Sequence, residues 1–168
     1  MITQSEKCHL KALPIRDNHN CFACSSNNSC GLHMNFYTDD SAVYSFVSVP
    51  KHMCGWNNLV HGGIISTLLD EIMSWAAIYL LKRIILTKSI TVDFIKPIYI
   101  EQSLKVVGQV ENLVHEKKAI MQGEIFNESE TLCAQSVGTF SLFTPERIKE
   151  HKIMDDEAMA SLIEFMTV

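Results

Sequence analysis

The sequence predicts an α+β domain in which one long, buried helix packs against a largely antiparallel sheet. Three observations lead to this prediction. The chain has 168 residues, enough for one domain with a real core. A long apolar helical segment lies near the middle, with two strand-like runs before it and four after it. Because strands and helices do not alternate in this order, the chain does not build parallel βαβ units.

The composition agrees with a folded globular protein. Hydrophobic residues make up 47% of the chain, and only 7 glycines and 4 prolines interrupt it, which excludes a linker or a disordered tail. The net charge is -5, and no cluster of lysine and arginine appears. We therefore expect no nucleic-acid partner, because such partners require a basic patch.

The first part of the chain divides into an extension and two strands. Residues 1–30 are irregular in pattern, and we interpret them as an N-terminal extension with a cysteine cluster. The domain itself is expected over residues 31–144. Its first strands are expected at residues 32–37 and 42–49, and residues 51–60 are interpreted as a loop.

The central helix is expected from Gly62 to about Leu81. It is apolar nearly all round, as is typical of a helix buried in a core. Asp70 and Glu71 interrupt the apolar run. Two adjacent carboxylates near a bilayer centre would cost roughly 2.5–3.5 kcal/mol each, so we expect no membrane span.

Four strand-like runs follow the helix, at residues 84–96, 103–111, 118–126 and 132–143. Apolar and polar residues alternate in them, which indicates strands with one buried face. Residues 145–168 have an amphipathic pattern and are expected to form a tail of one or two short surface helices.

The cysteines and the N-terminus bear on location. Residues 1–10 contain no apolar segment of the kind that a secretory signal needs. Six cysteines in a chain without an export signal favour reduced thiols over a disulfide framework. The sequence therefore predicts a cytoplasmic protein.

Candidate chemistry begins at the start of the helix, where His61 is followed by Gly62 and Gly63. Glycines let a ligand approach the backbone closely, and the first N–H groups of a helix have no partner within it. With the helix dipole, these donors could receive the negative charge that develops on a thioester carbonyl oxygen. A loop that simply leads into a helix is the alternative interpretation.

Asp70 is the second candidate, because a carboxylate on an apolar element is costly unless it is paired or used. It could deprotonate a water molecule or attack a carbonyl directly. Alternatively, Asp70 or Glu71 could pair with a structural arginine, or Glu71 could reach solvent. Asp70 lies about 10 Å along the helix axis from the Gly63 N–H. We therefore hypothesise a two-fold dimer that sets the glycine end of one helix against the carboxylate of another.

Further segments carry a resemblance to a known family. A strand that closes with a basic residue and proline, at residues 94–97, follows the helix. A Cys-x-x-Cys motif with a later Gly-Leu lies within residues 21–32. With the His-Gly-Gly sequence and Asp70, these segments resemble the hotdog-fold thioesterases of the phenylacetate-pathway and 4-hydroxybenzoyl-CoA type. The resemblance covers residues 21–143.

The resemblance implies an α+β hotdog fold, in which the antiparallel sheet wraps around the helix, and a homodimer that is often paired into a tetramer. It implies an acyl-CoA substrate, bound at the dimer interface and hydrolysed to a free acid and CoA. Gly63 would polarise the thioester carbonyl, Asp70 of the facing subunit would act as general base or nucleophile, and Thr87 would help to hold the water. The residues expected to contact substrate are His61, Gly62, Glu71 and Asn58. No metal or redox cofactor is needed for this chemistry.

Departures from the family pattern, and residues that could serve either function or packing, leave alternatives open. Gly55 stands where many relatives have an asparagine, so a non-catalytic acyl-CoA-binding sensor or scaffold is the alternative function. Bulky helix residues could line an acyl tunnel or could pack in the core: Met73, Trp75 and Tyr79.

The cysteine cluster has two interpretations of its own. Cys21, Cys24, Cys30 and His33 offer four possible zinc ligands at short spacing, which would fit a zinc-stabilised interaction module. Against zinc, the second half lacks a paired motif and His33 falls in an expected strand. The cysteines are otherwise expected to be small, buried packing residues.

Overall fold

The computed structural model describes residues 9–15, 19–150, 154 and 156–167, and one antiparallel sheet organises them. Seven strands in these ranges pair in the order β1-β2-β3-β5-β6-β7-β4. Their bounds are β1 (Lys11–Ala12), β2 (Phe36–Thr38), β3 (Val43–Ser48), β4 (Ile84–Phe94), β5 (Ser103–His115), β6 (Lys118–Phe126) and β7 (Leu132–Phe143). The helices are η1 (Lys51–Met53), α2 (Gly62–Leu81), α3 (Pro145–Glu150) and α4 (Asp156–Thr167).

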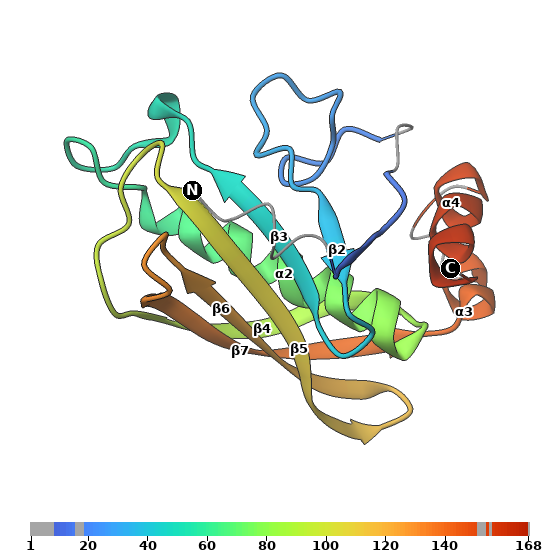
Figure 1. Cartoon of the computed structure of the whole chain (residues 1–168). Helices are drawn as coiled ribbons and strands as arrows, with labels where there is room; N and C mark the ends of the chain where they lie inside the picture. Colours follow the sequence, from blue (N-terminus) through green and yellow to red (C-terminus); the bar gives the residue numbers. More distant parts are fainter. Residues whose placement is uncertain (1–8, 16–18, 151–153, 155, 168) are drawn as a thin grey trace.

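Helix α2 is the centre of the core, and the sheet curves around it (Figure 1). The predicted α+β architecture is therefore confirmed, with the helix at the expected residues. By length and hydropathy α2 would also suit a membrane span, a test that the core helix of a soluble protein passes as well. In this structure the sheet covers much of the surface of α2, so the apolar side chains of the helix are buried against the strands.

Glycines on the inner face of the sheet allow α2 to lie close to it. Gly108 of β5 and Gly123 of β6 are directly opposite each other in the register. A Cβ atom on Gly108 would lie 2.6 Å from the Ile72 carbonyl oxygen of α2, nearer than such atoms approach. A Cβ on Gly123 would lie 3.1 Å from Met73. The helix backbone thus sits where a side chain would otherwise stand.

Replacing Gly108 by alanine is expected to lower the free energy of unfolding by about 1–3 kcal/mol, because a backbone atom of α2 must move to admit the methyl group. Urea denaturation measures the change. Gly62→Ala is the matched control, since a Cβ there meets only the Phe94 ring at 3.6 Å. Equal stability of the two variants would show that the contact does not limit helix placement.

Segments near both ends of the chain contribute to the same core, which the sequence did not predict. Residues 1–30 were expected to be irregular, but Lys11–Ala12 pairs with β2, and Leu13 is buried. The tail was expected on the surface, yet Phe165 of α4 is buried and its ring centroid lies 4.4 Å from that of Trp75. Figure 1 shows α4 beside the end of α2. The apolar face of the tail is covered because Trp75 faces it.

The first predicted strand is shorter than expected. Only Phe36–Thr38 pairs in the sheet, and His33 has a φ of 51°, so its expected place in a strand is wrong. The backbone before β2 bonds instead to the preceding segment: Leu32 N–H donates to Phe22 O, and Met34 N–H donates to Ala23 O. These bonds hold the N-terminal segment in place. They also occupy backbone N–H groups that would have to pair with a neighbouring strand if β2 began earlier.

Candidate active site

His61 caps the start of α2. Its extended backbone (φ -62°, ψ 135°) ends the preceding loop, and its Nδ1 accepts a hydrogen bond from the Gly63 N–H at 2.9 Å. This bond satisfies one of the donors that a helix start leaves free. The side chain of His61 is exposed. The Gly63 N–H, which was expected to donate to the substrate carbonyl, therefore already donates to an acceptor within the chain.

An apolar pocket opens beside this helix start. It has a volume of about 340 Å³. Gly62 and Ile65 of α2 form one side, and the segment that follows β4 forms the other. The lining residues are Leu59, Val60, Gly62, Ile65, Phe94, Ile95, Lys96, Pro97 and Ile98. Phe94 is 58% exposed, which is high for a phenylalanine, so this wall is open to a ligand or a second chain.

The sequence pattern did not indicate that residues 94–98 line a pocket; it indicated only a family resemblance at residues 94–97. Two adjacent apolar residues, Phe94 and Ile95, at the end of an alternating strand were the available signal. Asn58 was expected at the substrate. Its side chain is exposed and its backbone carbonyl accepts from Ile100 N–H at 2.8 Å, next to the pocket residue Leu59.

Asp70 and Thr87 meet across the space between α2 and β4. The Thr87 hydroxyl donates to Asp70 Oδ1 at 2.9 Å. Burial raises the pKa of Asp70, and the Thr87 hydrogen bond opposes this rise. The pairing of β4 with β7 shifts register between Thr87 and Ser89, so the strand is irregular where Thr87 turns to Asp70. A partly buried carboxylate with one donor can accept a proton from a water molecule.

The Asp70 pair lies beside an open edge of the sheet. β4 bonds only to β7, and its outer edge has no partner among the described residues. It is 11 residues long and carries exposed apolar side chains such as Leu86, which is 44% exposed. Long edges of this kind pair with another chain unless they are protected. Gly63 lies about 10 Å along the helix axis from Asp70, so the two groups of one chain do not share one site.

Glu71 faces a different neighbourhood from Asp70, because adjacent helix residues point about 100° apart. Its Oε1 accepts from Trp75 Nε1 at 2.8 Å and lies 3.8 Å from Cys21 Sγ. Burial raises the pKa of Glu71 to about 7, and the charge of Cys21 adds to the rise. Hydrogen bonding from Cys24 lowers the pKa of Cys21 to about 5, while the same contact raises the pKa of Cys24.

The four expected zinc ligands do not come together. Cys21 and Cys24 lie side by side with Glu71, which the sequence analysis did not include among the ligands. Cys30 is exposed, with its thiol 4.0 Å from the Ser29 hydroxyl. His33 is exposed as well, and its Nε2 lies 2.7 Å from the Asn28 carbonyl oxygen. The turn at residues 28–33 holds these last two away from the pair.

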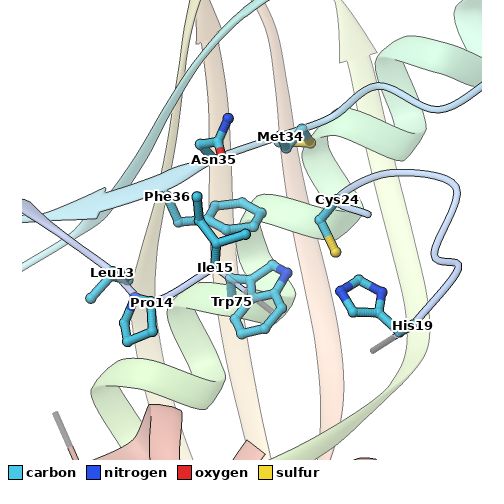
Figure 2. A pocket seen from close by; sticks show the side chains of 9 residues that line it. All are labelled: Leu13, Pro14, Ile15, His19, Cys24, Met34, Asn35, Phe36 and Trp75. Carbon is cyan, nitrogen blue, oxygen red and sulfur yellow. The ribbon is translucent and has the colours of Figure 1, made fainter. Parts of the chain in front are cut away.

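The bulky residues of α2 pack in the core. The Trp75 ring packs at a tilt against the rings of Phe36 and Phe165, and Met73 lies against glycines of the sheet. Tyr79 is buried, and its hydroxyl group donates to Asp40 Oδ1 at 2.6 Å. Trp75 also lines a small pocket on the N-terminal side, together with Cys24 and other residues shown in Figure 2. Of the two interpretations, core packing accounts for their contacts.

Comparison with known proteins agrees with the observed fold. Residues 57–134 match the family model described as the thioesterase superfamily. A search of curated proteins finds no match. Among solved structures, the E. coli PaaI protein from the phenylacetic acid degradation operon is 20% identical, with a TM-score of 0.62; the match covers 70% of this chain and 86% of that chain.

Two further similar structures contain a ligand. A hypothetical thioesterase from Streptococcus pneumoniae, solved with coenzyme A, is 19% identical with a TM-score of 0.57, over 61% of this chain and 79% of that one. A Streptococcus mutans protein solved with acetyl-CoA is 14% identical with a TM-score of 0.58, over 79% and 87%. At these identities the likeness establishes the fold.

Proposed function

We propose that the chain hydrolyses an acyl-CoA to a free acid and CoA, because its fold is that of hotdog thioesterases and residues 57–134 match the thioesterase superfamily model. One observation carries the proposal: the Thr87 hydroxyl holds the Asp70 carboxylate beside the outer edge of β4, which pairs with no other strand among the described residues. The two similar streptococcal proteins were solved with coenzyme A and with acetyl-CoA, which supports a CoA ester as the substrate.

In the proposed reaction, Asp70 takes a proton from a water molecule that Thr87 helps to hold. The water oxygen forms a bond to the carbonyl carbon of the thioester, and the carbonyl oxygen becomes negatively charged. The C–S bond then breaks, and the leaving thiolate takes the proton from Asp70 as CoA departs. Direct attack by the Asp70 carboxylate, followed by hydrolysis of the anhydride, is the second route open to the same residue.

The developing negative charge is assigned to the Gly63 N–H at the tip of α2. In the structure this N–H donates to His61 Nδ1, so the substrate carbonyl has to replace the ring as acceptor. The exposed side chain of His61 leaves room for the ring to turn. The Gly62 backbone borders the same apolar pocket, where the acyl or pantetheine part would lie. Asn58 precedes the pocket residue Leu59 in the chain, and we assign it to the rim of the substrate site.

Glu71 is not assigned to the substrate, although it was expected there. Its carboxylate is bonded to Trp75 and lies against the cysteine pair. By contrast, among the described residues the Asp70 carboxylate has one hydrogen bond, which it accepts from the Thr87 hydroxyl. Between the two acids, the contacts favour Asp70 as the working one.

A homodimer completes the proposed site. Pairing of the exposed β4 edges would bury apolar side chains such as Leu86 and satisfy the backbone groups of the strand. It would also set Asp70 of one subunit near the helix tip of the other. Two such dimers would then associate into a tetramer, as the family resemblance implies. We propose a cytoplasmic location, since each cysteine in the described ranges carries a free thiol.

Thiol release from a panel of acyl-CoAs tests the proposed function. The panel includes short, long and aryl acyl groups, and free CoA is detected as it forms. We expect turnover with at least one class of acyl group. Tight CoA binding without turnover on any member would reject hydrolysis.

That second outcome would support the alternative function, a non-catalytic acyl-CoA sensor or scaffold. One observation favours it: the Gly63 N–H already has an acceptor in His61, as a helix cap without catalytic duty would. Gly55 also stands where many relatives carry an asparagine. Hydrolysis in the assay would exclude this alternative.

A further inference from the structure

Three metal-ligating side chains gather outside the proposed catalytic centre, where the N-terminal segment crosses α2. Cys21 and Cys24 come from that segment, and Glu71 comes from the helix. One ligand atom from each lies within 4.8 Å of those of the other two. We propose that Cys21, Cys24 and Glu71 bind one structural Zn²⁺ ion that fastens the N-terminal segment to α2. This proposal stands apart from the thioesterase activity.

The spacing of the three groups suits zinc. With Zn–S near 2.3 Å and Zn–O near 2.0–2.2 Å, ligand atoms of a tetrahedral site are roughly 3.5–3.8 Å apart. Cys21 Sγ lies 3.8 Å from Glu71 Oε1. A turn closed by the bond from Ser25 N–H to Cys21 O, at 3.1 Å, brings the two cysteines to the same side. Small side-chain adjustments would therefore complete the site without moving the backbone.

The chemistry of the cluster also suits a cation. Zinc binding would deprotonate both thiols, and the two thiolates and the carboxylate would then balance the charge of the ion. None of the ion pairs found among the described residues includes Glu71. A divalent ion supplies the missing positive charge. Thiolate ligands select zinc over magnesium and calcium, which prefer oxygen.

His19 is the candidate for the fourth ligand, because structural zinc sites are closed by four protein groups. Figure 2 shows its ring beside the thiol of Cys24, and both residues line the same small pocket. His19 Nδ1 accepts from the Cys21 backbone N–H at 3.2 Å, so this nitrogen carries the lone pair that a metal needs. A rotation of the ring would direct it at the ion.

Metal analysis of the full chain tests the proposal. Protein purified without chelator is expected to hold about one zinc per chain, in line with a single four-ligand site. After removal of zinc and titration with Co²⁺, we expect thiolate-to-cobalt charge-transfer absorption. Cys24→Ser and Glu71→Gln should lose the metal, and His19→Ala should bind it more weakly. Cys30→Ser is the matched control and should retain it, because Cys30 lies outside the cluster.

Alkylation of the wild-type chain keeps the test decisive if a variant fails to fold. Cys21 and Cys24 should react only after a chelator is added, whereas exposed Cys30 should react in both conditions. Zinc should also raise the melting temperature of the stripped protein. A metal-free protein without the cobalt band, full retention of zinc by Glu71→Gln, or a disulfide between Cys21 and Cys24 in the purified chain would each overturn the proposal.

Discussion

Replacing Asp70 by asparagine is expected to lower kcat/KM for acyl-CoA hydrolysis by about 10³-fold, the scale of a lost general base. Asparagine keeps the size of the side chain and an oxygen that can accept from Thr87, so the fold and CoA affinity should stay unchanged. Thiol-release kinetics and CoA titration measure the two quantities. Only the proton acceptor is removed, so the loss should fall on kcat.

Asp93→Asn is the matched control for this prediction. Asp93 is an exposed acid on β4, the strand that carries Thr87, and its carboxylate accepts a hydrogen bond from Gln135 Nε2 at 3.1 Å. It should retain full activity. Thr87→Ala adds a pH readout: the Thr87 bond opposes the raised pKa of Asp70, so its removal should move the acidic limb of kcat/KM to higher pH. The limb has this sign because a base is lost as pH falls through its pKa. Unchanged kinetics in Asp70→Asn would contradict the assignment.

Much of the fold follows from local patterns. The last two strands, β6 and β7, begin and end at the residues that alternation predicted, since one face of each is buried against α2. The central helix could be predicted equally well, because it is a largely apolar segment of 20 residues. The pairing of Lys11–Ala12 with β2 was not, because two residues carry no periodic signal. The burial of Phe165 depends on Trp75, a contact between distant parts of the chain.

The candidate site could be predicted in part. The offset of Asp70 from the His-Gly-Gly sequence and the resemblance together indicated Asp70 and Thr87, which the structure brings within hydrogen-bond distance. The different surroundings of Glu71 could not be predicted, because they depend on the path of the N-terminal segment over the helix. The hydrogen bond from the Gly63 N–H to His61 could not be predicted either, because the spacing of residues does not determine the orientation of the His61 ring.

Mixing two inactive variants is expected to restore activity if each site takes Gly63 from one subunit and Asp70 from the other. Gly63→Pro removes the N–H within the first helical turn, where proline is tolerated, and should cost about 10²–10³ in kcat. Random reassortment with Asp70→Asn makes half of the dimers mixed, and one of the two sites in each is intact. About one quarter of wild-type activity should therefore return. Thiol release after joint refolding measures it.

The reverse mixture separates this arrangement from a site built within one chain. A chain that carries both Gly63→Pro and Asp70→Asn would damage both sites of a mixed dimer with wild type, since each site would borrow one altered group. Activity should fall below the share of wild-type chains as the double variant is added in excess. If Gly63 and Asp70 of the same chain acted together, the wild-type site would survive every mixture, and the two single variants would stay inactive when combined. Gly63→Ala, which keeps the N–H, should behave like wild type in the reassortment because only the His61 ring, 3.1 Å from the new methyl group, must shift.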